Sequence, residues 1–301
     1  MITIRQMRYF EVLAEALHFG RAARRLNISQ PALSAQIAQM EAFFGTTLFE
    51  RRSNGLIATA EGAALGERIR RILTEVRDLE ALAARPALLQ SRLKIGVIAS
   101  VAPYLLPTLL PAAAERHPQL ELEVRESVTA ALIDGLEAGE LDCVVLALPV
   151  EQAGLDHIEL AVDRFHLAVP EAAQARFGTP VPLARLKDEK LILLEEGHCL
   201  RDQALKVCEI AGAGRLASFG ATSLTTILRM VAGGLGITLI PELAVGSERM
   251  AGGIAFLPLA EPAPSRTLAL SFRRSAARRA DFEALADLLR DSLAPVRADT
   301  D

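Results

Sequence analysis

Apolar positions in the first 90 residues recur at the three- and four-residue spacing of helices. One apolar stripe runs through residues 7–14, and residues 19–26 predict a second, short helix. Ser29 can cap a third helix that carries Pro31 in its first turn. Gly45 is placed to end that helix. The pattern therefore predicts three short helices that share a small core.

A small β-wing and one long helix are expected after the third helix. Apolar residues within 48–57 flank the turn-forming residues 53–55, which favours a two-stranded wing. Thr59 can cap a helix rich in Arg, Glu and Ala that extends to about Leu89. Such a helix is typical of a linker or dimerisation element, and Pro86 can bend or end it.

The pattern changes at Leu93, where strand-like and helix-like segments begin to alternate. Strands are expected at 93–98, 120–124, 141–148, 191–194 and 267–272 with one more inside 233–241, and helices at 104–116, 130–138, 225–232 and 281–293. Alternation of this kind predicts an α/β domain with a mostly parallel sheet covered on both faces.

Length and composition indicate a globular protein of two or three domains. The chain has 301 residues, of which 51% are hydrophobic and 23% charged. No apolar run reaches the length of about 18 residues that a membrane helix needs, and the first residues do not have the pattern of a signal peptide. We therefore expect a cytoplasmic protein with no membrane partner. Its three cysteines do not form a structural disulfide framework.

Charge is distributed unevenly along the chain. Residues 1–90 contain 12 Arg, no Lys and 9 acidic residues, a balance of +3. The remainder contains 21 basic and 28 acidic residues, a balance of −7. A basic head on an acidic body is consistent with nucleic-acid binding by the head alone.

Residues 19–39 form a candidate helix-turn-helix. The third helix would present polar side chains at its N-terminal end to base edges in the major groove, while arginines of the wing would meet phosphate or the minor groove. The candidate DNA-binding residues are Ser29, Gln30, Pro31, Ser34, Gln36, Arg51 and Arg52. The alternative is an ordinary three-helix bundle with solvated polar residues.

Residues 193–208 contain two of the three cysteines. The thiolate of Cys199 could attack peroxide to give a sulfenic acid, and Cys208 could condense with it to form a disulfide. His198 and Arg201 can favour that thiolate electrostatically. Glu195, Glu196 and Asp202 oppose it, unless Asp202 mainly holds Arg201 in place. These residue types predict a thiol switch.

In a continuous helix, Cys199 and Cys208 would lie too far apart to form a disulfide. In a continuous helix, nine steps of ~1.5 Å separate the Cα atoms of Cys199 and Cys208 by about 13–14 Å, whereas a disulfide tolerates only about 4.4–6.8 Å. The intervening residues favour helix, so bonding would require remodelling. Both cysteines could instead be buried structural residues, as we expect for Cys143 within its apolar strand. A metal site is less well supported because the ligand spacing and a fourth ligand are missing, so no cofactor or metal is expected.

Several segments resemble LysR-type transcriptional regulators: residues 7–52, ATAEG at 58–62 and VAGGLGITLIP at 231–241. The resemblance extends over essentially the whole chain. It implies an α/β protein with a winged helix-turn-helix, a long linker helix and a regulatory domain like the periplasmic binding proteins. It also implies homotetramers on a double-stranded DNA operator, with RNA polymerase as a partner. The implied ranges are 1–58 for the DNA-binding domain, 59–90 for the linker helix and 91–301 for the regulatory domain, divided into subdomain I (91–162 and 266–301) and subdomain II (163–265).

The motif GHCLRDQ, followed by a second cysteine, resembles the peroxide-sensing OxyR branch of that family. The resemblance implies that Cys199 is peroxidatic and Cys208 resolving. It also implies hydrogen peroxide as the signal, glutaredoxin or thioredoxin as the reductant, and activation of transcription. The implied peroxide pocket consists of Ser100, Thr129, His198, Arg201 and Asp202. Ser100 stands where this branch generally has threonine, so the pocket lacks one methyl group.

Other functions remain open on the sequence alone. A LysR-type regulator could respond to a small metabolite held near Ser223, Thr225 and Thr226, although these residues could equally cap a helix. A thiol peroxidase and a periplasmic-type binding protein are alternatives of other classes, and the helix-turn-helix argues against both. Arg229 and Arg266 are basic residues for which we expect places near the site or the interfaces.

Overall fold

The computed structural model describes residues 1–52, 55–84, 88–212, 221–250 and 252–298. The chain forms two compact units. The first, which we call the head, comprises Met1–Arg85 with Glu137–Gly139, and the second, the body, comprises Pro86–Leu136 and Glu140–Asp301. Within the described residues, no helix is both long enough and apolar enough to cross a membrane.

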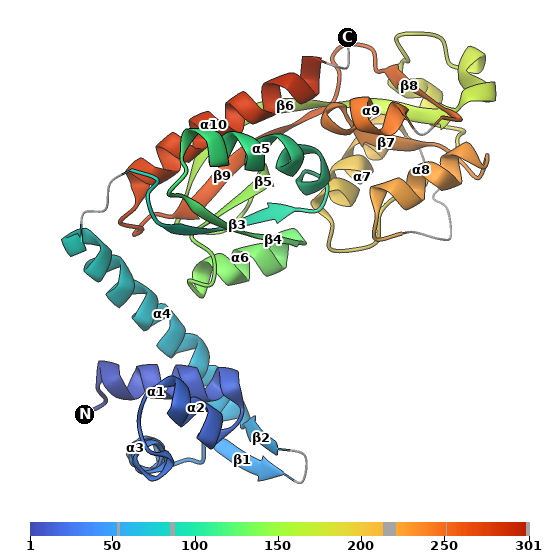
Figure 1. Cartoon of the computed structure of the whole chain (residues 1–301). Helices are drawn as coiled ribbons and strands as arrows, with labels where there is room; N and C mark the ends of the chain where they lie inside the picture. The colour runs from blue at the N-terminus through green and yellow to red at the C-terminus, as the bar shows by residue number, and fades with distance from the viewer. Residues whose placement is uncertain (53–54, 85–87, 213–220, 251, 299–301) are drawn as a thin grey trace. The chain divides into compact units, whose positions relative to one another are not determined.

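The head is a winged helix-turn-helix with a long helix (Figure 1). Its elements are α1 (Ile4–Ala16), α2 (Phe19–Arg25), α3 (Gln30–Phe44), β1 (Phe49–Arg52), β2 (Gly55–Ala58) and α4 (Ala60–Ala84). The strands pair antiparallel, with Phe49 opposite Ala58. Phe10, Leu33 and Ile37 lie in one buried core to which every helix of the head contributes.

Local signals in the sequence set the ends of these helices. The Ser29 hydroxyl accepts a hydrogen bond from the amide of Ala32 at 3.3 Å, which confirms the expected cap of α3. Gly45 ends that helix in the left-handed region at φ +69°, as expected. Thr59 accepts from the amide of Gly62 at 3.0 Å at the start of α4. The wing strands are confirmed, while residues 53–54 of the expected turn lie outside the described part of the chain.

The long helix ends earlier than expected. Its described part runs from Ala60 to Ala84, and Leu88 and Leu89 are no longer helical. Leu89 is fully buried in the core of the body, and its amide donates a hydrogen bond to Asp281 Oδ1 at 2.8 Å. At this point the chain already belongs to the α/β part of the molecule.

The body is an α/β unit around a seven-stranded sheet. Its strands are β3 (Arg92–Ile98), β4 (Glu121–Ser127), β5 (Cys143–Leu148), β6 (Leu155–Pro170), β7 (Thr238–Pro241), β8 (Ile254–Pro258) and β9 (Ser265–Arg273). Its α-helices are α5 (Ala102–Arg116), α6 (Thr129–Glu137), α7 (Cys199–Ala211), α8 (Leu224–Ala232), α9 (Glu242–Arg249) and α10 (Arg279–Ala298). The short 3₁₀ helices η1 (Glu171–Arg176) and η2 (Leu183–Leu186) complete the described elements.

The expectation of a mostly parallel sheet was wrong. The strand order is β4-β3-β5-β9-β6-β7, and β8 also pairs with β6. Among the named strands of the described residues, the β3–β4 and β3–β5 pairs are parallel and the other pairs are antiparallel. The antiparallel pairs come from β9, which pairs with β5 and β6, and from β6, which pairs with β9 over residues 155–164 and with β7 and β8 over residues 165–170.

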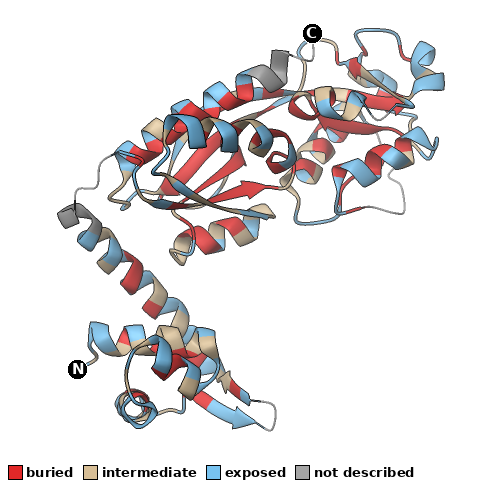
Figure 2. Cartoon of the chain, viewed as in Figure 1, coloured by how far each residue is buried: buried red, intermediate tan, exposed pale blue. Residues whose placement is uncertain are grey.

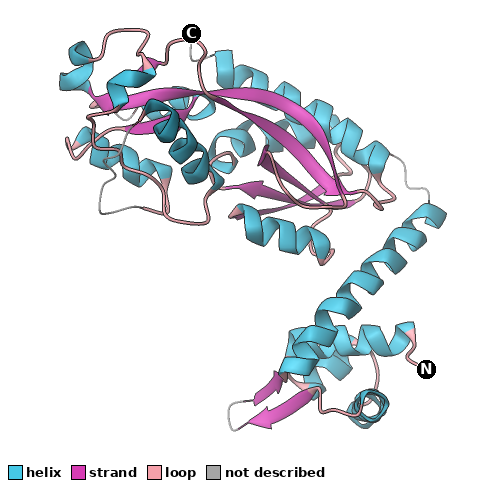
Figure 3. Cartoon of the chain, turned by 180° about the vertical axis from the view of Figure 1, so that it is seen from behind, coloured by secondary structure: helices cyan, strands magenta, loops and turns pink. Residues whose placement is uncertain are grey.

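Helices cover both faces of the β3–β5 region. α5 and α10 lie on one face and α6 on the other, as opposite views of the molecule show (Figure 1; Figure 3). Buried residues concentrate on the central strands and on the inward faces of these helices (Figure 2). The expected helices at 104–116, 130–138, 225–232 and 281–293 are confirmed with small shifts at their ends.

Further segments differ from the expectation, among them α9 and β8, which were not predicted. Residues 191–194 form no strand and make only isolated bridges, Leu191 to Ile237 and Leu194 to Ala221. In contrast, β6 was not predicted, because charged residues interrupt its apolar pattern. Along β6, apolar and charged residues both occur at buried and at exposed positions.

Candidate functional site

Cys199 and Cys208 lie on the same helix. Cys199 is the first residue of α7, and Cys208 lies near the end of this 13-residue helix. Nine helical steps of ~1.5 Å place their Cα atoms about 13–14 Å apart. All three cysteines of the chain are free. In this conformation the two sulfurs of the pair cannot bond, as the helical spacing predicted.

The three cysteines differ in their access to solvent. Cys199 is half-buried, whereas Cys208 is 2% exposed and Cys143 is fully buried. Burial raises the pKa of the Cys208 thiol and raises that of Cys143 further. Cys143 lies in the interior of the sheet, where an inert core residue was expected. Cys199 is therefore the thiol that a small solute can reach most readily.

The surroundings of Cys199 come from the first turn of α7. His198 occupies the N-cap position, where its side chain makes no capping hydrogen bond, so the positive end of the helix remains available to a negative charge. Arg201 Nη1 donates to the carbonyl of Leu194 at 2.8 Å and so anchors this turn to the preceding segment. Asp202 lies exposed in the same turn.

Ser100 and Thr129 lie at the same edge of the sheet. They follow the carboxyl ends of the adjacent parallel strands β3 and β4, the edge at which open α/β sheets bind ligands. Ser100 is buried, and its hydroxyl accepts a hydrogen bond from Arg266 Nη1 at 2.8 Å. The Thr129 hydroxyl is also buried, and within the described residues it has no hydrogen-bond partner. A buried hydroxyl of this kind can still bind a small polar molecule.

Two further polar residues bear on this site: Arg266, for which the sequence predicted a place near the site or the interfaces, contacts Ser100, and Gln203 was not predicted. Arg266 is fully buried and donates to Asp163 Oδ2 at 2.9 Å, in addition to its bonds to Ser100. Gln203 lies one turn after Cys199, and its Oε1 is buried without a partner among the described residues. The four-residue spacing from Cys199 could have identified Gln203, whereas the pairing of Arg266 required the undetected strand β6.

The side chain of Glu248 contacts the first turn of α8. Ser223 is the N-cap residue, but its side chain makes no capping hydrogen bond. Thr225 donates its hydroxyl hydrogen to Glu248 Oε1 at 3.1 Å. Thr226 and Arg229 are exposed on the same helix. A carboxylate of the chain therefore contacts one of the three residues near which the sequence left a metabolite site open.

The polar residues of the candidate DNA-binding surface surround the start of α3 and the wing. Gln30, Pro31, Arg51 and Arg52 are exposed, and Ser34 and Gln36 are half-buried. The guanidinium carbon of Arg51 lies 5.6 Å from the centroid of the Phe19 ring. This cation–π contact connects the wing to α2.

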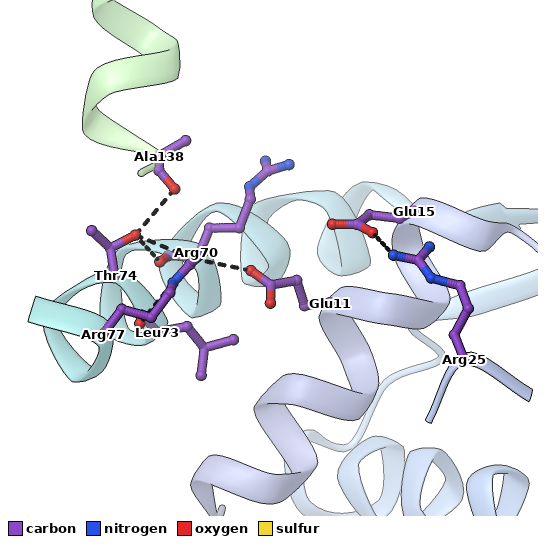
Figure 4. Close-up of polar contacts among 8 residues, drawn as sticks. All are labelled: Glu11, Glu15, Arg25, Arg70, Leu73, Thr74, Arg77 and Ala138. Atoms are coloured by element: carbon purple, nitrogen blue, oxygen red, sulfur yellow. Dashed lines mark hydrogen bonds and ion pairs between the residues drawn. The ribbon is translucent and has the colours of Figure 1, made fainter. Parts of the chain in front are cut away.

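Ion pairs brace the helices behind this surface. Glu11 of α1 pairs with Arg77 of α4 at 3.5 Å, and Glu15 of α1 pairs with Arg25 at 2.6 Å (Figure 4). Burial raises the pKa of Glu11 despite the nearby Arg77. These contacts fix α1 against its neighbours and leave the start of α3 facing solvent. Among the described residues, no group of three or more His, Cys, Asp or Glu side chains is arranged to hold a metal ion.

Two family models match the chain and together span most of it. The bacterial regulatory helix-turn-helix protein model of the lysR family matches residues 4–63, and the LysR substrate binding domain model matches residues 86–294. The DNA-binding transcriptional dual regulator OxyR of Escherichia coli K12 is 41% identical over 290 residues, which cover 96% of this chain and 95% of that protein.

Solved structures of OxyR proteins are also similar to this chain. Full-length OxyR from Pseudomonas aeruginosa, with a cysteine-to-aspartate substitution, superimposes with a TM-score of 0.81 at 35% identity and covers 96% of this chain and 95% of that one. A cysteine-to-serine variant of Corynebacterium glutamicum OxyR with hydrogen peroxide bound has a TM-score of 0.69 at 32% identity. It covers 99% of this chain and 94% of that one.

Proposed function

Because the chain belongs to the OxyR branch of the LysR family, we propose that it is a DNA-binding transcription regulator that senses hydrogen peroxide through Cys199 and Cys208. One observation carries the proposal: a half-buried cysteine begins helix α7, and a buried cysteine lies near the end of the same helix. The first cysteine is accessible to peroxide, and the second is held apart until the helix is remodelled.

The proposed chemistry has two steps. The thiolate of Cys199 attacks one oxygen of hydrogen peroxide, the O–O bond breaks, and hydroxide leaves and takes up a proton to become water. The product is a sulfenic acid on Cys199. The thiol of Cys208 then displaces the sulfenic hydroxyl as a second water, and the S–S bond forms. The two thiols together lose two electrons and two protons to the peroxide.

We propose that residues of α7 together with Ser100 and Thr129 supply the polar groups for the first step. The N-terminus of α7 and the neighbouring His198 favour negative charge on the attacking sulfur. Thr129 and Gln203 carry buried polar atoms that have no partner among the described residues, so both can hydrogen-bond peroxide. Ser100 is oriented by Arg266. In the proposed pocket Arg201 fixes the first turn of α7, and Asp202 remains at its rim.

The second step connects the chemistry to transcription. A disulfide between Cys199 and Cys208 is incompatible with α7 as one helix, so its formation must remodel residues 199–208. We propose that this change alters the packing of subdomains I and II and thereby the contacts between subunits of a homotetramer. The DNA-binding domains at 1–58, joined through the linker at 59–90 to the regulatory domain at 91–301, then change their footprint and their contact with RNA polymerase.

Resetting the switch requires two electrons. A dithiol reductant of the glutaredoxin or thioredoxin type returns them by thiol–disulfide exchange, which regenerates both cysteines and leaves the reductant oxidised. Such exchange fits a cytoplasmic location, where the thiol pool is reduced. In this scheme the protein reacts once per signal, and it does not act as a peroxidase enzyme.

Substitution of Cys199 tests the proposal. Cys199→Ser should bind operator DNA but lose the peroxide-dependent change in footprint, whereas Cys143→Ser should retain it. Thiol counting should show the loss of two thiols per wild-type chain after one equivalent of peroxide. An unchanged footprint response in Cys199→Ser, or repeated peroxide turnover with a thiol reductant at the rate of an enzyme, would overturn the proposed function.

A further inference from the structure

One carboxylate joins three helices of the body. Glu248 Oε1, on α9, accepts a hydrogen bond from the Tyr104 hydroxyl at 3.0 Å and another from the Thr225 hydroxyl at 3.1 Å. Tyr104 lies on α5 in subdomain I, whereas Thr225 begins α8 in subdomain II. Glu248 is half-buried and Tyr104 is buried. This bridge therefore crosses between the two subdomains.

The hydroxyl of Tyr104 is well suited to donate this hydrogen bond to Glu248. Burial, reinforced by the neighbouring carboxylate of Glu248, raises the pKa of Tyr104. The hydroxyl therefore keeps its proton and remains a hydrogen-bond donor across the range in which the protein works. A donor to a charged acceptor in a partly buried setting contributes more than an exposed neutral pair.

The other end of α9 is also fixed by buried polar groups. The amide of Leu243 donates to Asp163 Oδ1 at 3.1 Å, and Asp163 Oδ2 accepts from Arg266. Arg266 in turn donates to the hydroxyl of Ser100. The helix thus contacts α5 directly through Glu248 and Tyr104, and it is connected to the loop that precedes α5 through two side chains, Asp163 and Arg266.

A second set of contacts connects α8 to the start of α7, the helix that carries Cys199 and Cys208. Arg201 of α7 donates to the carbonyl of Leu194, and the amide of Glu195 donates to the carbonyl of Ala221 at 3.0 Å. Leu194 and Ala221 also form an isolated bridge. Ala221 lies only four residues before Thr225. These contacts form a path from the first turn of α7 through Leu194 and Ala221 to the start of α8.

We propose that Glu248 is a positioning residue that couples the redox state of Cys199 and Cys208 to the packing of subdomain I against subdomain II. The inference rests on the proposed function. In the reduced protein, Glu248 holds the start of α8 against α5. Formation of the disulfide removes the helical turn that carries Arg201, which releases the Leu194–Ala221 bridge and shifts α8. This shift breaks the bridge through Glu248 and so frees Tyr104 of α5 from α8.

The coupling predicts a change in the redox equilibrium. Loss of the bridge in Glu248→Ala weakens the reduced arrangement selectively, because the oxidised arrangement has already displaced α8. Disulfide formation should become about tenfold more favourable, which for a two-electron couple corresponds to a reduction potential about 30 mV more negative. The rate at which Cys199 is first oxidised should change by less than about twofold, since Glu248 takes no part in the attack on peroxide.

Reduction potentials of the full-length protein and footprints in both redox states test this proposal. Glu248→Gln keeps an acceptor oxygen for Tyr104 and Thr225, so it should restore the wild-type potential to within about threefold in the equilibrium constant. Tyr104→Phe removes one donor and little volume, and it should shift the potential in the same direction as Glu248→Ala. The reduced Glu248→Ala protein should also show part of the oxidised footprint.

The outcomes separate this inference from the proposed function. A wild-type protein that forms no Cys199–Cys208 disulfide with peroxide would overturn both. A wild-type switch with unchanged potentials in folded Glu248→Ala and Tyr104→Phe would overturn the role of Glu248 alone. Equal shifts in Glu248→Ala and Glu248→Gln would also contradict it, because they would show that the hydrogen bonds are not responsible. Circular dichroism provides the control for folding, and Tyr104→Phe supplies the decisive comparison if Glu248→Ala unfolds.

Discussion

A glycine in the middle of α7 should make the protein easier to oxidise. Lys206 is exposed and lies between Cys199 and Cys208, so its replacement changes helix propensity with little effect on packing. Lys206→Gly should cost the helix about 0.7 kcal/mol. The disulfide form, in which residues 199–208 are no longer one helix, should not be destabilised by this substitution.

The size of the effect follows from the energy of the helix. A loss of about 0.7 kcal/mol in the reduced form favours the disulfide about threefold. For a two-electron couple this shift makes the reduction potential about 15 mV more negative. The potential is measured by equilibrating the protein in dithiothreitol buffers, alkylating the remaining thiols and quantifying each form by mass spectrometry.

Two matched variants control for other causes. Lys206→Ala removes the same charge but keeps high helix propensity, and its potential should stay near that of the wild type. Glu283→Gly places a glycine at an exposed position of α10, so it should lower stability without moving the potential. A potential for Lys206→Gly that is unchanged, or less negative, would refute the claim that disulfide formation requires α7 to unfold.

Three further predictions address other contacts. Arg266→Ala should lower the free energy of unfolding by about 3–5 kcal/mol, because it leaves Asp163 charged and unpaired in the core; a loss below about 1 kcal/mol in urea titrations would contradict this. In a double-mutant cycle of DNA affinity, Phe19→Leu and Arg51→Ala should show a coupling of about 0.5–1 kcal/mol, whereas additive losses would rule out positioning of the wing by the aromatic ring. In the reduced native protein at neutral pH, iodoacetamide should modify Cys199 well before the other cysteine of the pair, whose thiol has a pKa raised by burial; peptide mapping that finds the reverse order would exclude the proposed roles.

Local signals in the sequence predicted the head well. Ser29, Gly45 and Thr59 act within a few residues of their own positions, so the ends of α3 and α4 could be inferred without the tertiary structure. The helical spacing of Cys199 and Cys208 is equally local, and α7 has the predicted form.

The sheet of the body depends on contacts between distant residues, and there the prediction failed. The strand β6 bears Asp163, Arg164 and other charged residues that obscure its pattern, yet Asp163 is buried because Arg266 lies opposite it on β9. That pairing joins positions 103 residues apart in the chain. Ser100 was found through family resemblance, but its contact with Arg266 needed the same long-range pairing.

Hydrogen exchange at the backbone amides of α7 tests the central claim most directly. In the reduced protein, amides in the interior of residues 199–211 should be protected by helical hydrogen bonds. After one equivalent of peroxide, those between Cys199 and Cys208 should exchange much faster, while the amides of β3 and β5 keep their protection. Protection of α7 that remains unchanged in protein shown by peptide mapping to contain the disulfide would contradict the account.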